Sequence, residues 1–268
     1  MTESLPHWHL LGAGNMGTLA AWYLTRAGHT VSVVTDSPAP PQHKTLIFAE
    51  HNASLTLPCV SPSQFHSTIT HLLVASKTPY TEAALRRVNG HLDSMTLVLR
   101  FQNGMGALDD RLPAGATMLE AITTSAVKGQ SPQHTIVAEN ITWLGGLPQP
   151  PAWFEGLQRH WPNLCWEADI RWVQWKKLVA NAVINPLTAL HDVPNGALVS
   201  DPALQQQARA LCAEADTLLT ALDSRWPGNS FSAVLQVARD TAGNTSSMRA
   251  DRQRGATTEL EAINGWLL

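Results

Sequence analysis

Residues 175–188, WKKLVANAVINPLT, combine a long apolar pattern with polar residues at a regular spacing. Lys177, Asn181 and Asn185 stand four residues apart, which places them on one stripe of a helix. The apolar residues between them predict a largely buried helix, in which a polar group without a partner costs roughly 2 to 7 kcal/mol. Two interpretations follow: a stripe that faces water, or a polar row that lines a cleft, with Lys177 as proton donor and the amides as substrate clamps.

A proline interrupts the same apolar pattern. Pro186 follows Asn185 directly, removes one backbone hydrogen bond and disfavours helical geometry at the residue before it. The carbonyl of Ala182 would then lose its usual partner. The sequence therefore predicts either a kink or the end of the helix at this point.

The N-terminal region has the order strand, glycine loop, helix, strand within about thirty residues. Residues 8–11 and 30–35 are strand-like, and a helical pattern between them ends at Gly28. The loop consists of Gly12, Ala13, Gly14, Asn15, Met16 and Gly17. In a dinucleotide-binding loop the first glycine makes the tight turn, the second admits the pyrophosphate, and the third allows close helix–strand packing. We therefore predict a dinucleotide site here; the alternative is a glycine-rich turn without a ligand.

Two further polar residues follow predicted strands. Residues 69–76 form a buried strand pattern that ends at Lys77, and residues 96–101 form another that leads into Asn103 and its glycine-rich surroundings. Parallel sheets bind ligands at the carboxyl ends of their strands, so both residues are predicted to contact cofactor or substrate. The alternative for Lys77 is an exposed lysine on a turn.

The remaining pattern divides the chain in two. Further strands are predicted at 117–124 and 135–144. Helices are predicted at 80–88, 171–190, 202–222, 231–241 and 257–268, and another one follows the proline-rich break at 147–151 and ends at about 161. Strands and helices alternate up to the proline-rich break at 147–151, whereas no convincing strand follows residue 170. We predict an α/β fold with a Rossmann-type dinucleotide-binding domain over residues 1–168 and an all-helical C-terminal domain over residues 169–268.

Charge and composition limit the classes of partner. The formal net charge is −3, charged residues make up 15% of the chain, and no block is dense in lysine or arginine. These values argue against a nucleic-acid surface. Several of the ten tryptophans lie near the predicted domain boundary, and we interpret them as interdomain packing rather than as a stacking platform for bases.

Cysteine and histidine positions give no metal site. The three cysteines are far apart, so neither a disulfide framework nor a zinc site is predicted. His7 and His9 flank Trp8, but no third ligand is implied. No basic segment followed by an apolar run opens the chain, and no window approaches 18 apolar residues, so we expect a cytoplasmic protein without a membrane partner.

Taken together, the motifs resemble one family. GAGNMG, Lys77, QNGMG, KLVANAVINPLTAL with a following PNG, and NTSSMRADRQRGATTELEAINGWLL occur in the order found in ketopantoate reductases (2-dehydropantoate 2-reductases). The resemblance covers essentially the whole chain. It implies a Rossmann domain followed by a helical domain, and the NADPH-dependent reduction of 2-dehydropantoate to pantoate on the route to pantothenate and coenzyme A.

The resemblance also implies residue roles. Lys177 matches the catalytic proton donor and Glu259 a glutamate at the active centre, which would either pair with Lys177 or bind a hydroxyl; without the resemblance, Glu259 reads equally well as a charge at the start of a helix. The substrate positions are Asn103, Asn181, Asn185, Asn195, Asn244, Ser246 and Ser247, with Ser247 the most direct contact. The cofactor positions are the residues of the loop from Gly12 to Gly17, together with Lys77, Asn103, Val127 and Glu259.

One departure concerns the cofactor. Asp36 stands just past the second strand, where the family usually has an arginine for the 2′-phosphate of NADPH. An acid there repels a phosphate and suits a ribose hydroxyl instead. Thr35, His43 and Lys44 are nearby candidates to offset its charge. NADPH is the predicted cofactor, and NADH is the alternative that Asp36 leaves open.

A second departure lies at the end of the sequence. The chain stops at Leu268, where family members usually continue for one or two helices. We expect a weakened helical domain, an exposed apolar surface or a partner chain, and either a monomer or a homodimer. The alternatives for the function are the reduction of another 2-oxo acid, or a non-catalytic relative that only binds nucleotide.

Overall fold

The computed structural model describes residues 5–268, which separate into two units. The first unit runs to Gln102 and resumes over Leu108–Ile170. The second consists of Asn103–Ala107 and Arg171–Leu268. The segment that carries Asn103 therefore belongs to the helical unit, although it follows a strand of the first.

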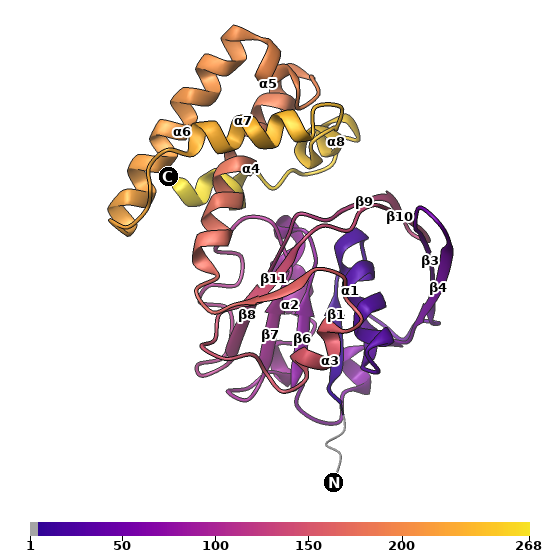
Figure 1. Cartoon of the computed structure of the whole chain (residues 1–268). Coiled ribbons are helices and arrows are strands. Elements are labelled where there is room, and N and C mark those ends of the chain that lie inside the picture. Colours follow the sequence, from indigo (N-terminus) through magenta and orange to yellow (C-terminus); the bar gives the residue numbers. More distant parts are fainter. Residues whose placement is uncertain (1–4) are drawn as a thin grey trace. The chain divides into compact units, whose positions relative to one another are not determined.

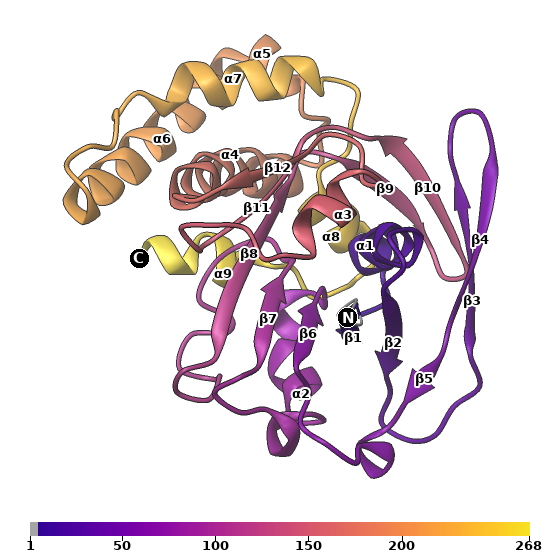
Figure 2. The same cartoon turned by 60° about the horizontal axis from the view of Figure 1, so that its bottom comes forward.

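An eight-stranded sheet organises the first unit. Its order is β12-β11-β8-β7-β6-β1-β2-β5, and all neighbouring pairs are parallel except β8 and β11. The strands are β1 (His7–Leu11), β2 (Thr30–Val34), β5 (Cys59–Val60), β6 (His71–Val74), β7 (Leu97–Arg100), β8 (Thr117–Thr123), β11 (Thr142–Gly145) and β12 (Leu164–Glu167). From β5 to β8 the strands have the 3-2-1-4-5-6 order of a doubly wound dinucleotide fold (Figure 2).

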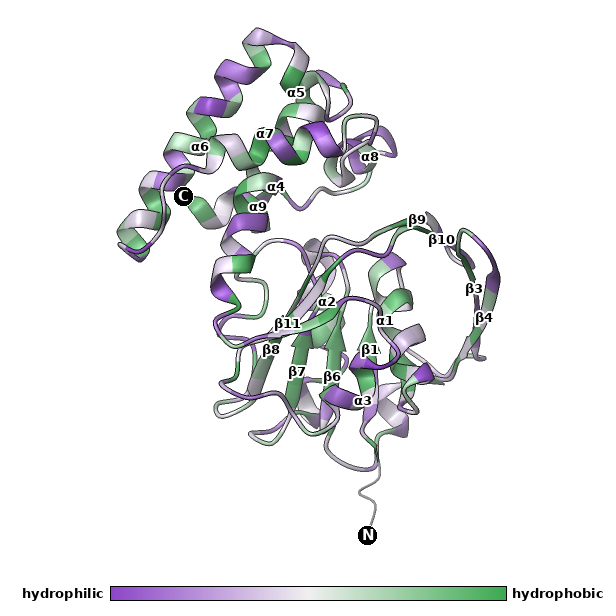
Figure 3. Cartoon of the chain, viewed as in Figure 1, coloured by the Kyte–Doolittle hydropathy of each residue, from purple (hydrophilic) through white to green (hydrophobic). Residues whose placement is uncertain are grey.

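The central strands are apolar on both faces. Leu10 and Leu73 belong to one buried cluster, whereas Leu11 and Leu72 belong to another. Successive residues of a strand point to opposite faces, so this division shows that both faces of the sheet are covered. Figure 3 shows the resulting hydrophobic colouring along β6 and β7.

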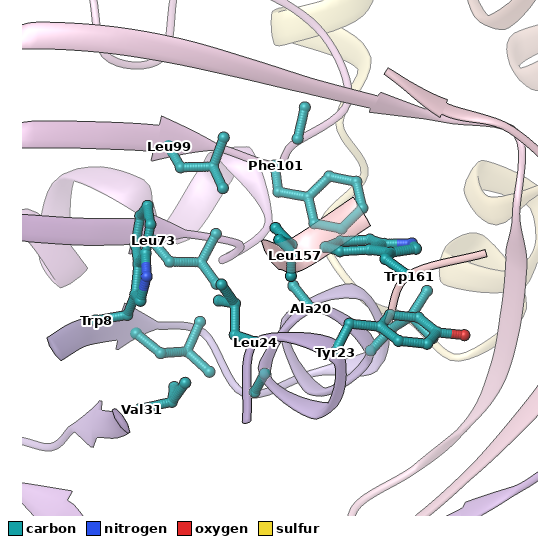
Figure 4. Packing of buried hydrophobic residues seen from close by; sticks show 14 of the residues in the cluster. Trp8, Ala20, Tyr23, Leu24, Val31, Leu73, Leu99, Phe101, Leu157 and Trp161 are labelled. Atoms are coloured by element: carbon teal, nitrogen blue, oxygen red, sulfur yellow. The ribbon is translucent and has the colours of Figure 1, made fainter. Parts of the chain in front are cut away.

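Three short α-helices accompany the sheet: α1 (Asn15–Arg26), α2 (Thr81–Leu85) and α3 (Phe154–Gln158). Single 3₁₀ turns lie at η1 (Pro62–Gln64), η2 (Thr78–Tyr80) and η3 (Asn89–His91). Helix α1 lies beside β1 (Figure 1). Its Tyr23 and Leu24 pack into the same buried cluster as Trp8 and Trp161, and the ring of Tyr23 stacks on Trp161 (Figure 4). Fully burying one such apolar side chain stabilises a fold by about 1.5–3 kcal/mol. This packing fixes α1 against the sheet.

A second, four-stranded sheet in this unit was not predicted. Its order is β4-β3-β10-β9, with β3 (Gln42–Ile47), β4 (Asn52–Leu57), β9 (Ala126–Gln130) and β10 (Gln133–Ala138). The single strand predicted at 135–144 is wrong, because β10 and β11 of that stretch belong to different sheets. β3 and β10 pair over a long sequence separation, for example Thr45 with Gln133.

The second unit is helical throughout its described residues, so the predicted fold class is confirmed. Its elements are α4 (Arg171–His191), α5 (Ala197–Ser200), α6 (Pro202–Leu222), α7 (Ser230–Asp240), α8 (Ser247–Gln253), α9 (Leu260–Ile263) and the 3₁₀ turn η4 (Gly265–Leu267). Helix α4 packs against α6, α7, α8 and α9. Its Val179 and Val183 lie in a buried cluster with Cys212 and Leu219 of α6.

The structure corrects one helical prediction and decides between the two alternatives left open at Pro186. The helix predicted at 257–268 is divided into α9 and η4, with Asn264 at the junction. Helix α4 continues past Pro186 to His191, so the proline does not end it. By contrast, α6 spans the predicted residues, and the Asp201 carboxylate caps it by accepting from the backbone N–H groups of Ala203 and Leu204.

The tryptophans near the unit boundary pack inside each unit. In the first unit Trp153 meets Trp8 edge to face, with ring centroids 5.3 Å apart. In the second, Trp172 stacks on Trp226 at 5.9 Å. Within residues 5–268, no helix has the length and apolar character needed to cross a membrane.

Candidate functional site

The glycine loop follows the carboxyl end of β1. This strand lies between β6 and β2, where the strand order reverses. Gly12 has φ +97°, and a Cβ there would lie 2.4 Å from the backbone nitrogen of Ser76. A Cβ at Gly17 would lie 2.0 Å from the carbonyl oxygen of Gly12. A Cβ at Gly14, however, would meet no heavy atom within 4 Å. Packing thus requires the outer glycines, and the open face at the middle one leaves room for a ligand.

Helix α1 begins at this open face. Its N-cap is Gly14, and no side chain of residues 5–268 caps the helix. The first backbone N–H groups of a helix lack intrahelical partners, and the helix dipole adds a partial positive charge. Such an end suits the pyrophosphate of a dinucleotide. The loop geometry and the uncapped helix therefore fit the predicted cofactor.

A buried lysine from the second sheet supports the loop. Lys44 of β3 is only 3% exposed, and its Nζ donates to the carbonyl oxygen of Ala13 at 3.0 Å and to Ser131 Oγ at 2.9 Å. Burial lowers the pKa of this ammonium group. The sequence suggested that Lys44 offsets the charge of Asp36, whereas in the structure its ammonium group binds the backbone of the glycine loop.

A buried histidine makes a second contact from the same sheet. His134 of β10 lies with its Nδ1 2.7 Å from Asn15 Oδ1, and its Nε2 is 3.5 Å from Thr18 Oγ1. Burial is the main cause of the lowered pKa of His134, and the charge of Lys44 adds to it. The ring is therefore neutral near pH 7, so Nδ1–H donates to the amide oxygen. Neither contact was predicted, because β10 is more than a hundred residues from the loop.

The charge of Asp36 is met by an arginine that the sequence did not single out. Asp36 lies two residues beyond β2, and Arg87 follows α2. Arg87 Nε donates to Asp36 Oδ1 at 2.5 Å, and Nη2 donates to Oδ2 at 3.0 Å. Their separation of 51 positions along the sequence hides this pair from any local pattern.

The other predicted cofactor residues of this unit lie on β6 and β9. Lys77 is half-buried and precedes η2, just after the end of β6. Since β6 is the neighbour of β1, Lys77 follows the strand that adjoins the glycine loop. Val127 is half-buried on β9 and pairs with Ile136 of β10. Their contacts with a cofactor stay predictions.

In the second unit, the polar stripe of α4 does not lie on an open surface. Lys177 and Asn181 are half-buried, and Asn185 is buried. Burial lowers the pKa of Lys177 to about 8, and the negative charge of Glu259 opposes this shift. An ammonium group with a pKa just above neutral is well suited to donate a proton, because a general acid is most efficient when its pKa lies near the operating pH.

Glu259 is buried and accepts a hydrogen bond from Asn103 Nδ2 at 3.2 Å. The segment around Asn103 is held against α9, because the N–H of Met105 donates to the carbonyl of Ala262 at 2.8 Å. Gly104 allows this approach: its φ is +75°, and a Cβ would lie 2.4 Å from the same carbonyl oxygen. Glu259 thus accepts a hydrogen bond from Asn103, and its negative charge opposes the lowering of the Lys177 pKa.

Two other predicted asparagines are joined by a backbone contact. The N–H of Asn195 donates to the carbonyl of Asn244 at 3.1 Å, and Asn195 Nδ2 donates to Thr241 Oγ1 at 2.9 Å. The buried Oδ1 of Asn195 has no hydrogen-bond partner among the described residues. A buried acceptor of this kind is costly to leave unpaired, so a ligand hydroxyl would suit it.

The two predicted serines have different surroundings. Ser246 is buried, and its Oγ accepts from the N–H of Arg249 as the N-cap of α8 and lies 2.7 Å from Thr188 Oγ1 of α4. Ser247 is exposed at the first residue of α8. The hydroxyl of Ser246 therefore links α8 to α4, while direct substrate contact by either serine stays a prediction.

Metal ligands do not gather in the described residues. Within residues 5–268, no group of three or more histidine, cysteine, aspartate or glutamate side chains could hold a metal ion. The polar groups above suit a dinucleotide in the first unit and a small anionic substrate in the second.

Comparison with known proteins agrees with these features. Residues 8–149 match the family model "Ketopantoate reductase PanE/ApbA", and residues 169–268 match its C-terminal counterpart. A 2-dehydropantoate 2-reductase from Shigella flexneri is 31% identical over 272 residues, which cover 97% of this chain and 86% of that protein.

Solved structures show the same fold. A PanE/ApbA family ketopantoate reductase from Ralstonia eutropha JMP134 superposes with a TM-score of 0.82 at 21% identity, covering 97% of this chain and 90% of the other. A D-mandelate dehydrogenase in complex with NADH and anilino(oxo)acetate superposes with a TM-score of 0.82 at 18% identity, with the same coverage. The two family models cover nearly all of the sequence, in the order that the fold requires, and the chain therefore belongs to the ketopantoate reductase family of oxidoreductases.

Proposed function

We propose that this chain reduces the ketone of 2-dehydropantoate to the hydroxyl of pantoate with NADPH, on the route to pantothenate and coenzyme A. The observation that carries the proposal is the half-buried Lys177, whose pKa is lowered to about 8 in the presence of the buried Glu259. A reductase of this kind needs a proton donor beside the ketone oxygen, and this lysine has the required acidity.

The chemistry divides between cofactor and protein. Reduced nicotinamide, held through the glycine loop and the start of α1, would supply the hydride that the ketone carbon accepts. Negative charge then develops on the ketone oxygen, which the Lys177 ammonium stabilises and protonates. A positioned proton donor of this type contributes about 10²- to 10⁴-fold in rate. Glu259 favours the charged form of Lys177, and Asn103 orients Glu259 through its hydrogen bond.

Amide and hydroxyl groups of the same unit would orient the substrate. Asn181 and Asn185 follow Lys177 along α4, and Asn195 has a buried acceptor that no described residue pairs with. With Ser247 they can hold the carboxylate and hydroxyl of the substrate. Correct orientation of the reacting groups is worth up to about 7–11 kcal/mol, so these contacts are proposed to matter as much as the proton transfer.

The first unit would hold the dinucleotide. The open face at Gly14 and the uncapped start of α1 suit the pyrophosphate. Lys77 and Val127 are proposed as further contacts. This division assigns cofactor affinity to the first unit and proton transfer to the second, which makes the two functions separable by mutation.

Loss of reduced-nicotinamide absorbance with 2-dehydropantoate tests the proposal directly. We expect turnover with NADPH that depends on both substrates. A folded sample that binds NADPH but gives no turnover above the blank would overturn the proposed reaction and favour the non-catalytic alternative.

A second candidate is the reduction of another 2-oxo acid. It is favoured by the D-mandelate dehydrogenase structure, which has the same fold and was solved with NADH and anilino(oxo)acetate. The lysine mechanism is unchanged in this case, and only the substrate pocket differs. A panel of aliphatic and aromatic 2-oxo acids decides between the two, because the true substrate will have the highest kcat/KM.

A further inference from the structure

The end of β2 determines what the adenosine ribose meets in a doubly wound fold. An acidic residue there binds the ribose 2′-hydroxyl of NAD, whereas a nearby arginine accommodates the 2′-phosphate of NADP. β2 is the neighbour of β1, which leads into the glycine loop, and Asp36 lies two residues beyond β2. This chain therefore has the acid of an NAD site at the position that reads the 2′ group.

The structure also brings a guanidinium to the same place. Arg87 makes a two-point contact with the Asp36 carboxylate through Nε and Nη2. A guanidinium has five N–H donors, so this contact leaves three, including both on Nη1. The carboxylate oxygens likewise keep lone pairs that can accept a ribose hydroxyl.

Exposure argues against a purely structural role for this ion pair. The side chain of Asp36 is 78% exposed and that of Arg87 is 29% exposed. Exposed ion pairs contribute little to the stability of a fold. The pair is accessible to a ligand, and its two members have opposite preferences for a 2′-phosphate.

We propose that Asp36 and Arg87 together form the recognition site for the 2′ position of the adenosine ribose, and that Arg87 is the residue that allows this chain to accept a 2′-phosphate. This inference rests on the proposed function, since it concerns the cofactor of that reaction. In the pair the acid is neutralised, so it no longer repels a phosphate. Arg87 supplies the cation from the segment after α2, in place of an arginine on the β2 loop.

The proposal predicts opposite effects for two substitutions. Arg87→Ala leaves an isolated carboxylate facing the phosphate, and should lower the ratio of kcat/KM for NADPH to that for NADH by about 10- to 100-fold, the range expected for one charge-assisted contact. Asp36→Ala frees the whole guanidinium and removes the ribose acceptor, so the same ratio should rise. Arg86→Ala is the matched control, because Arg86 is the neighbouring arginine and pairs with Glu82 instead, at 2.9 Å.

Calorimetry measures the binding of each cofactor without any 2-oxo acid. It therefore tests the recognition site separately from the proposed reaction. If the unmodified chain binds neither cofactor, the proposed function fails and this inference fails with it. If it binds cofactor, but Arg87→Ala and Arg86→Ala give the same ratio of NADPH to NADH affinity, the recognition site is wrong while the reductase proposal stands. Opposite shifts for Arg87→Ala and Asp36→Ala, with Arg86→Ala unchanged, support the inference.

Discussion

Asn264 Nδ2 donates to the carbonyl oxygen of Ala182 at 2.9 Å. That carbonyl is the one that Pro186 deprives of its backbone N–H partner inside α4. A side chain at the junction of α9 and η4 thus replaces the missing helical hydrogen bond. This substitution explains how α4 continues through the proline and carries the polar stripe in an unbroken helix.

The Asn264 contact predicts a specific coupling with Pro186. Asn264→Ala leaves the Ala182 carbonyl unpaired and should lower the free energy of unfolding by about 1–3 kcal/mol. In a Pro186→Ala background the helix regains its own N–H donor, so the same substitution should cost clearly less. Urea unfolding of the unmodified chain, the two single variants and the double variant measures the coupling. Equal costs in both backgrounds would show that Asn264 stabilises the helix in some other way.

Lys177→Ala should lower the turnover number by about 10²- to 10⁴-fold, because the ketone oxygen loses its proton donor. The affinity for NADPH should stay nearly unchanged, since the proposed pyrophosphate contacts lie in the other unit. Steady-state kinetics and calorimetry measure the two quantities separately. Lys176→Ala is the control, because Lys176 is the preceding residue and is exposed. Normal turnover in Lys177→Ala would refute the proton-donor role.

The pH dependence follows from the same lysine. The pKa of Lys177 is lowered to about 8, and only its charged form donates a proton. The reduction rate should therefore be constant near neutral pH and fall as the pH rises through about 8. Glu259→Gln removes the negative charge that raises this pKa, so the fall should move to lower pH. A profile that is unchanged in Glu259→Gln would disprove the electrostatic link between the two residues.

Local patterns were sufficient for the elements that carry the proposed chemistry. The glycine spacing predicted the turn, the open position and the start of α1, because each requirement lies within six residues. The spacing of four in α4 predicted a shared stripe for Lys177, Asn181 and Asn185, and the helix is continuous over all three. The helix predicted at 202–222 is α6, whose start is capped by Asp201.

Long-range pairing was beyond such patterns. The strand β3 alternates only weakly between polar and apolar residues, and it gains its structure by pairing with β4 and β10. That sheet brings the buried Lys44 within hydrogen-bond distance of the carbonyl oxygen of Ala13, which lies 31 positions earlier in the sequence. Arg87 meets Asp36 for the same kind of reason. The sequence identified Asp36 as unusual but contained no local sign of its partner.

The buried Lys44 leads to a prediction for cofactor affinity. Lys44→Met keeps the length of the side chain but removes the hydrogen bonds to Ala13 and Ser131. The glycine loop should then be less well ordered, and the dissociation constant for NADPH should rise by about tenfold, as expected for the loss of one or two hydrogen bonds. The turnover number at saturating cofactor should change little.

Lys128→Met on β9 of the same sheet is the control, because Lys128 is exposed. A fall in turnover number without a change in cofactor affinity would contradict a positioning role for Lys44.

Histidines near the amino ends of β1 and β6 predict the acid stability of the first unit. Burial is the main cause that lowers the pKa of both His9 and His71 to about 4. In an unfolded chain a histidine titrates near 6.5. Between about pH 6.5 and 4 the unfolded chain holds more protons, so the free energy of unfolding should fall as the pH drops through that range. His7 stacks on His9 at 4.4 Å and adds like-charge repulsion once both are protonated.

Urea unfolding at pH 7 and pH 5 measures this effect. Because both rings are only partly buried, we expect a loss on the order of 1–2 kcal/mol per histidine after solvent screening. His9→Leu and His71→Phe should each reduce the difference between the two pH values, since an apolar side chain cannot take up a proton. His66→Leu is the control, because His66 is exposed. An equal pH effect in all three variants would show that other groups, such as the carboxylates, determine the acid stability.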